Sequence, residues 1–268
     1  MDPRRLYSAL VFVPLLYVGI RYSPPWLFAL LMSTAALFAL WEFLTLYFGQ
    51  TGSILTHIAS CCMGAILLFF LGHTFNGMLV LGVVGFVTII LVWFCQSPAT
   101  AHRLLPSWAA YLFGIGYIVV FLGHYILLRN LENGIALVFF VILVTWLSDT
   151  GGFFIGKTLG KHPLAPTLSP KKTIEGLLGG VLFSVIGAII SHFTFIPFFS
   201  FGQCVMLGVA LALLGAMGDL AESAIKRSVH VKDSGTIIPG HGGVLDRVDS
   251  LLFTGPTMYY YVMFSLSS

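Results

Sequence analysis

The stretch GIALVFFVILVTWLSD, residues 134–149, decides the fold class of this chain. Fifteen uncharged residues precede Asp149, and the apolar character continues to residue 156. A helix needs about 20 mainly apolar residues to cross the hydrocarbon core of a bilayer. An ionisable group inside such a helix costs about 2.5–3.5 kcal/mol on insertion scales, so it usually faces the protein interior and serves a function. The stretch therefore predicts a membrane helix that carries a functional carboxylate near its end.

The composition extends this interpretation to the whole chain. Hydrophobic residues make up 58% of the 268 residues and charged residues only 9%, whereas soluble domains carry about 25% charged residues. Lipid must therefore cover most of the surface, and we expect an all-α, polytopic membrane helix bundle. Nine apolar runs predict about nine transmembrane helices, at residues 6–22, 26–47, 54–71, 77–95, 108–128, 134–156, 177–197, 203–222 and 250–266.

We expect one integral membrane domain over residues 1–268, with N-terminal spans in about 1–133 and a catalytic half in about 134–268. Two polar loops interrupt the catalytic half, at 157–176 and 223–249. Eleven of the 13 Lys and Arg residues fall on the N-terminal side of the predicted membrane. Because positive residues collect on the cytoplasmic side, we expect the N-terminus and both polar loops in the cytoplasm, and the C-terminus outside.

Acidic side chains gather at the ends of the predicted helices. Asp219 and Lys226 lie on one face of a helix that leaves the membrane, with Glu222 and Ser223 between them. Asp246 and Asp249 share a face at the start of the last helix, and a glycine-rich loop precedes them. Carboxylates bind hard cations such as Mg²⁺, while lysine, arginine and histidine suit phosphates. The pattern indicates a metal and phosphate site that opens to the cytosol, to which the intramembrane acids Glu42 and Asp149 are candidate contributors.

Two blocks of this sequence resemble the phosphatidate cytidylyltransferase (CDP-diacylglycerol synthase) family. The first block runs from Ser223 to Asp249, with SAIKR at 223–227, KDSG at 232–235 and PGHGGVLDRVD at 239–249. The second runs from Ser148 to Gly176 and includes SPKKTIEG at 169–176. Thr167 and Ile174 depart from the family pattern, in which a basic and an aromatic residue are common at these two positions.

The resemblance implies an integral enzyme of phospholipid synthesis, located in the cytoplasmic membrane, that uses CTP, phosphatidic acid and Mg²⁺. It implies catalytic roles for Asp219, Asp246, Lys226 and Asp249. Asp219 and Asp246 are expected to hold the metal, with Asp249 beside them or at a second cation. The expected substrate-binding residues are Ser148, Asp149, Lys171, Lys172, Ser223, Arg227, Lys232, His241, Gly242, Gly243 and Arg247. A homodimer is a further expectation from the family.

Alternatives from other classes remain at this stage. Another CTP-dependent lipid enzyme, such as a polyprenol kinase or an ether-lipid cytidylyltransferase, needs similar groups, and an ion-coupled transporter also uses intramembrane acids. Residues 151–158, GGFFIGKT, formally match the phosphate-binding P-loop, but they end an apolar helix and do not follow a strand. The chain has no Asp-Gly dipeptide, with which the CDP-alcohol phosphotransferase signature begins. It also has no basic tail or stripe, so we exclude a nucleic-acid partner.

Overall fold

A computed structural model describes residues 14–49, 52–73, 104–231, 233–235 and 242–266. The chain divides into two compact units. Unit 1 comprises residues 1–127 and 233–247, and unit 2 comprises residues 128–232 and 248–268. The prediction that the chain forms a single membrane domain is not tested by this division and stays a prediction.

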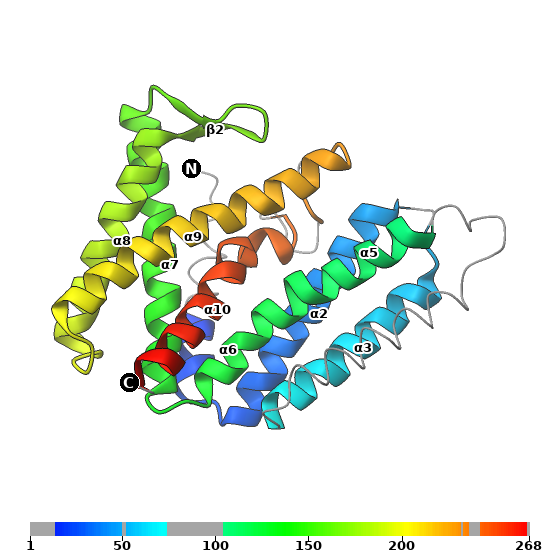
Figure 1. Ribbon diagram of the computed structural model, residues 1–268, viewed down its shortest axis with the longest axis horizontal. Helices are drawn as coiled ribbons and strands as arrows, with labels where there is room; N and C mark the ends of the chain where they lie inside the picture. The colour runs from blue at the N-terminus through cyan, green and yellow to red at the C-terminus, as the bar shows by residue number, and fades with distance from the viewer. Residues whose placement is uncertain (1–13, 50–51, 74–103, 232, 236–241, 267–268) are drawn as a thin grey trace. The chain divides into compact units, whose positions relative to one another are not determined.

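Unit 1 is built from apolar helices (Figure 1). Its helices are α2 (Pro25–Phe48), α3 (Ile54–His73), α5 (Leu104–Gly114), the π-helical segment η3 (Ile115–Val120) and most of α6 (Phe121–Arg129). Helices α5, η3 and α6 follow one another without a break, so they form the single span that was predicted at 108–128.

Unit 2 contains three long helices and one hairpin. Helix α7 (Gly134–Leu159) leads into the antiparallel strands β1 (Pro163–Ala165) and β2 (Ser169–Thr173), and α8 (Ile174–Thr194) follows directly. Helix α9 (Phe201–Ser228) completes the set, and α10 (Leu245–Leu266) contributes its part from Val248 onward. Figure 1 shows α7 and α8 side by side, with the hairpin at the end where they join.

The predicted all-α membrane bundle is confirmed, while the count of nine spans is not. Within the described residues, six helical segments are long and apolar enough to cross a membrane. The predicted span at 77–95 and the first part of the span at 6–22 lie outside the described residues. The predicted span at 250–266 coincides with α10, which is not among the six.

The polar loop predicted at 157–176 is more ordered than its composition indicates. Helix α7 continues to Leu159, and α8 begins at Ile174 because the Thr173 hydroxyl accepts a hydrogen bond from the Gly176 amide at 3.1 Å. The hairpin occupies the residues between them. Hydropathy identifies only the apolar part of a helix, so the polar last turn of α7 and the hairpin were not predicted.

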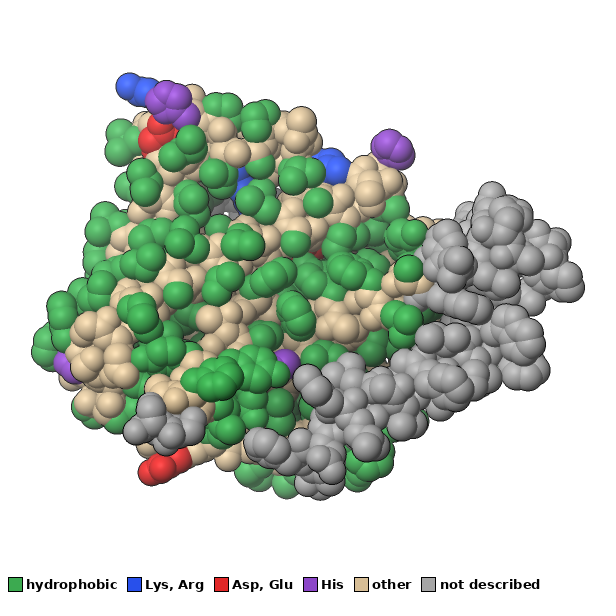
Figure 2. Space-filling model, in the orientation of Figure 1, with side chains coloured by type: hydrophobic (Ala, Val, Ile, Leu, Met, Phe, Trp, Pro, Cys, Tyr) green, Lys and Arg blue, Asp and Glu red, His purple; other side chains and the backbone are tan. Residues whose placement is uncertain are grey.

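Large apolar side chains cover much of the outer surface, as lipid contact requires. On α8, Leu178, Leu182 and Phe193 are 64%, 55% and 74% exposed. Figure 2 shows hydrophobic side chains over most of the visible described face, with only scattered charges.

Helices α7 and α8 approach each other so closely that side chains are excluded along part of their contact. A Cβ atom on Gly176 would lie 2.9 Å from the Gly152 carbonyl oxygen, and one on Gly180 would lie 3.0 Å from the Ser148 carbonyl oxygen. On each helix the glycines are spaced four residues apart, at 152 and 156 and at 176 and 180. This spacing is typical of membrane helices that pack backbone to backbone.

Substituting Gly179 tests this contact, because a Cβ atom there would lie 2.5 Å from the Cβ of Ile155. Overpacking costs about 1–3 kcal/mol, so we expect Gly179→Leu to lower the thermal unfolding midpoint in detergent by about 3 °C or more. Gly202→Ala is the matched control, since a Cβ atom there meets nothing within 4 Å. Equal midpoints for the two variants would contradict the proposed close packing.

Candidate active site

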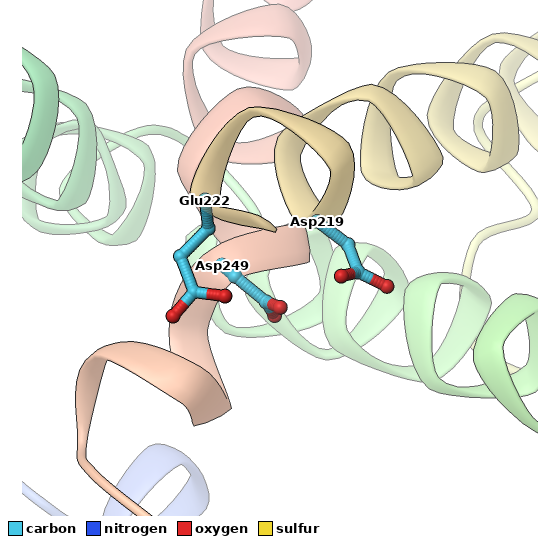
Figure 3. A group of neighbouring side chains, drawn as sticks. All are labelled: Asp219, Glu222 and Asp249. Carbon is cyan, nitrogen blue, oxygen red and sulfur yellow. The ribbon is translucent and has the colours of Figure 1, made fainter. Parts of the chain in front are cut away.

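Three carboxylates of unit 2 face one another. Asp219 and Glu222 lie three residues apart on α9, and Asp249 lies in the first part of α10. One carboxylate oxygen from each lies within 4.8 Å of the others. Figure 3 shows the three side chains directed into the same space, with Asp249 between the other two. Glu222 is fully buried, and Asp219 and Asp249 are half-buried. We call these three residues the acid group.

Two lysines neutralise part of the acid group. The Lys172 ammonium, from β2, lies 2.5 Å from an Asp219 oxygen, and the Lys226 ammonium, from α9, lies 2.5 Å from a Glu222 oxygen. With all three carboxylates ionised, the group and its two paired lysines would carry one net negative charge, a state that burial and the Asp219 carboxylate disfavour by raising the pKa of Asp249 to about 8. Since charges of like sign repel strongly where water is scarce, the group favours a bound cation.

The donor set fits a magnesium ion. All three residues supply carboxylate oxygens, which are the ligands that hard divalent cations prefer. The spacing of these oxygens allows one ion to contact all three. Among the described residues, no other group of three or more His, Cys, Asp or Glu side chains meets this spacing.

Asp149 extends the polar surface from α7. The Ser250 amide donates a hydrogen bond to Asp249 at 2.7 Å, and the Ser250 hydroxyl lies 3.5 Å from an Asp149 oxygen. Ser250 therefore lies between the acid group and Asp149, which is itself exposed.

A cavity of about 700 Å³ opens beside Asp219 in unit 2. Ser148 and Asp149 line it, and three lysines contribute cationic side chains to its wall. Much of the remaining wall is backbone, because glycines of α7 and α8 line it. The lining residues are Ser148, Asp149, Gly152, Phe153, Gly156, Lys157, Leu164, Lys171, Lys172, Thr173, Gly176, Leu177, Gly180, Ala216 and Asp219.

The hairpin that carries Lys171 and Lys172 is held at both ends. At its base, Glu175 accepts hydrogen bonds from the amides of Lys161 and His162 at 3.0 and 3.2 Å, and from the His162 ring at 2.5 Å. Near its turn, the Arg227 guanidinium donates to the Leu168 carbonyl at 3.3 Å. These contacts fix the hairpin backbone between α8 and the end of α9.

A second pair of carboxylates, Glu42 and Asp246, binds described residues on either side of residues 236–241 in unit 1. One Asp246 oxygen accepts hydrogen bonds from the amide and hydroxyl of Ser234 and from the Gly243 amide, at 2.8–3.0 Å. Glu42, buried in α2, accepts from the Leu245 amide at 2.9 Å. A Cβ atom on Gly243 would lie 2.5 Å from a Glu42 oxygen, so a larger residue there would have to displace the Glu42 carboxylate.

The predicted site residues fall into three sets. In unit 2, Asp219 and Asp249 belong to the acid group, and Lys172 and Lys226 form ion pairs with it. Ser148, Asp149 and Lys171 line the cavity. Ser223 is half-buried on α9. Asp246, Gly242 and Gly243 belong to the unit 1 loop, where Gly242 has a φ of 84° and Arg247 is exposed. Lys232 and His241 lie outside the described residues. The predicted role of Arg227 in phosphate binding stays a prediction, although its side chain now bonds Leu168 and Val231.

Sequence reasoning left the role of Glu222 open, although it completes the acid group. Its position three residues after Asp219, on a helix that is otherwise apolar up to that point, was the available signal. The glycine spacing on α7 and α8 was not used either. The segment resembling a P-loop is helical throughout, because residues 151–158 lie inside α7. Its backbone amides are therefore not available to cradle a phosphate.

The comparison with known proteins identifies the family of the chain. The cytidylyltransferase family profile matches residues 3–265. The phosphatidate cytidylyltransferase of Bacillus subtilis (strain 168) is 41% identical over 145 residues, which cover 54% of this chain and 54% of that protein. That of Staphylococcus aureus (strain COL) is 41% identical over 149 residues, covering 55% and 56%.

A third relative, the phosphatidate cytidylyltransferase of Staphylococcus epidermidis (strain ATCC 35984), is 34% identical over 175 residues, covering 65% of this chain and 66% of that protein. The chain thus spans between about half and two thirds of the length of the curated relatives it matches. Because the family profile covers nearly the whole chain, the protein belongs to the cytidylyltransferase family.

Proposed function

We propose that this protein is a phosphatidate cytidylyltransferase, which transfers the cytidylyl group of CTP to phosphatidic acid and releases pyrophosphate. The observation that carries the proposal is the acid group with its two lysines beside a lysine-lined cavity, on helices long enough to cross a membrane. The relatives named for this activity support it.

The reaction requires charge neutralisation more than proton transfer. An oxygen of the phosphatidic acid phosphate attacks the α-phosphorus of CTP, and the bond from this phosphorus to the β-phosphate oxygen breaks. A phosphate monoester has a second pKa of about 6, so the nucleophile is already mostly a dianion at neutral pH. The remaining difficulty is to bring two anions together in line, which cations and positioning groups overcome.

The described residues fit these needs. Asp219, Glu222 and Asp249 would hold Mg²⁺, which supplies positive charge to the phosphate oxygens when bound. Lys171 and Lys172 of the hairpin line the cavity, and Lys226 lies at the acid group. Ammonium groups are strong donors to phosphate oxygens. A metal role for Asp246 and a second cation remain part of the proposal.

Helix lengths support a site at the edge of the membrane. At 1.5 Å per residue, Asp219 lies about 27 Å along α9 from Phe201, close to the roughly 30 Å thickness of the hydrocarbon core. The phosphate of a lipid lies at this level. We therefore propose an inner-membrane enzyme whose site faces the cytosol, where CTP is available, with the N-terminus inside and the C-terminus outside. A homodimer is a further proposal.

The same position argues against an ion-coupled transporter. Transporter sites usually lie near the bilayer midplane on interrupted helices, whereas α9 is continuous through Asp219 and Glu222. A kinase or cytidylyltransferase that acts on another lipid would share the metal and phosphate groups, so only the substrate separates it from the main proposal.

The direct test is incubation of the purified full chain with labelled CTP, phosphatidic acid and Mg²⁺. We expect CDP-diacylglycerol and pyrophosphate in equal amounts, and little product from a polyprenol or from an archaeal-type ether-lipid acceptor. Formation of CDP or ADP with a phosphorylated lipid would instead indicate a kinase. The absence of both CDP-lipid and pyrophosphate would reject the proposal.

Removing one charge from the acid group should abolish activity. We expect Asp219→Asn and Asp249→Asn each to lower kcat by about 100-fold or more, the scale of losing an electrostatic stabiliser of the transition state. Glu132→Gln is the matched control: it makes the same chemical change on an exposed residue that precedes α7, 17 residues before Asp149. Full activity in both acid-group variants, with unchanged thermal stability, would remove these residues from the mechanism.

Asp246→Asn separates metal binding from support of the loop. An amide oxygen can still accept hydrogen bonds from Ser234 and Gly243, but it is a weaker ligand for Mg²⁺. If Asp246 is a metal ligand, we expect the variant to need severalfold more Mg²⁺ for half-maximal activity. A lower maximal rate with an unchanged Mg²⁺ requirement would show that Asp246 only supports the loop.

A further inference from the structure

We propose that Lys172 acts as a built-in cation that competes with the metal for Asp219, and that it exchanges this carboxylate for a phosphate of the nucleotide when substrate binds. The inference rests on the proposed function, because it assigns a polyphosphate to the cavity beside the acid group. The inference adds that a nucleotide in that cavity changes the affinity of the acid group for metal.

The Lys172 ammonium is in contact with Asp219, and Lys172 also lines the cavity. The ammonium lies 2.5 Å from an Asp219 oxygen. The side chain thus stands between a metal ligand and the space for the nucleotide. A divalent cation at Asp219 and the ammonium at this distance repel each other, so the two cannot share that oxygen at low cost.

The side chain of Lys172 can move while its backbone stays in place. Hydrogen bonds to Glu175 hold the base of the hairpin, and the bond from Arg227 to Leu168 holds it near the turn. Beyond this fixed backbone, lysine has a flexible four-carbon stem. A rotation of the side chain is therefore enough to carry the ammonium from Asp219 toward a phosphate in the cavity.

Lys172 and Lys226 differ in how deeply their ion pairs are buried. Glu222, the partner of Lys226, has no exposed side-chain surface, and the Lys226 side chain is only 13% exposed. The side chains of Lys172 and Asp219 are 25% and 32% exposed. Breaking the Lys226 pair leaves an uncompensated charge away from water. In the other pair the Lys172 ammonium is itself buried, but Lys172 lines the cavity, so a phosphate there can replace Asp219 as its anionic partner while the partly exposed Asp219 stays hydrated. Lys172 is therefore the exchangeable cation of the two.

The consequence is that metal and nucleotide assist each other's binding. Without nucleotide, a metal ion must displace the ammonium of Lys172 into solvent. With a triphosphate in the cavity, the ammonium gains new anionic partners when it leaves Asp219. Linkage then requires that the metal raise the affinity for nucleotide to the same degree.

The test measures metal and nucleotide affinities separately in the purified full chain. Lys172→Met removes the charge and keeps the apolar stem. We expect Mn²⁺, titrated without nucleotide and followed by electron paramagnetic resonance, to bind about threefold to tenfold more tightly to this variant, the scale of a partly exposed ion pair. We expect the affinity for CTP to fall, so that the KM for CTP rises by a similar factor.

Lys171→Met is the matched control. This neighbour lies on the same strand, lines the same cavity and makes no ion pair with a carboxylate of the acid group in the described part of the chain. It removes the same charge, so a general electrostatic effect would raise Mn²⁺ affinity equally in both variants, and that result would overturn the proposal. Unchanged or weaker Mn²⁺ binding by Lys172→Met would also overturn it.

The Mn²⁺ titration of Lys172→Met and the assay of the proposed reaction can fail separately. If Lys172→Met binds Mn²⁺ more tightly but the wild-type protein makes no CDP-diacylglycerol, the competition stands and the proposed function fails. If the wild-type protein is active and Lys172→Met shows no gain in Mn²⁺ affinity, the function stands and the competition fails.

Discussion

The backbone contact between α7 and α8 is the constraint on which the site in unit 2 depends. Glycines at 176 and 179 let the two helices touch, because a Cβ atom there would lie 2.9 Å from the Gly152 carbonyl oxygen and 2.5 Å from the Ile155 Cβ. Helices α7 and α8 lie close together at the ends that the chain connects, and residues 160–173 between them fold back as the β1–β2 hairpin. The hairpin then carries Lys171 and Lys172 to a cavity that four glycines of α7 and α8 also line. The same glycines therefore hold the helices together and leave room for a ligand.

Charge distribution follows from the cost of placing ions away from water. Each acid of α9 is paired with a lysine, and the two lysines come from different elements, β2 and α9. Asp249, from α10, is the third carboxylate, and the Ser250 amide supports it. A group assembled from three elements in this way becomes complete only when unit 2 is folded. The charges that would disfavour the membrane in isolated helices become tolerable once they are brought together.

Most of the fold could be predicted from hydropathy, because apolar runs of about 20 residues have few alternatives to a membrane helix. The runs at 26–47 and 134–156 match α2 and α7 to within three residues. The hairpin could not be predicted this way, since its two short strands depend on Glu175 and Arg227, which are distant in sequence from the groups they bind. The helix-face pattern identified Asp219 and the signature contained Asp249, while the pairing of Lys172 with Asp219 joins residues 47 positions apart and follows only from the folded structure.

The two ion pairs of the acid group have different physical roles, although their distances are equal. Glu222 is fully buried, so its charge is tolerable only while Lys226 stays beside it. That pair belongs to the stability of α9, and one turn of helix separates its members. Asp219 and Lys172 are each about one quarter to one third exposed and come from separate elements. The Lys172 ammonium is buried, but Lys172 lines the cavity and Asp219 is partly exposed, so we propose that this pair can open without unfolding its surroundings. The acid group thus combines one pair that maintains its negative charge with one pair that can yield a carboxylate to a metal.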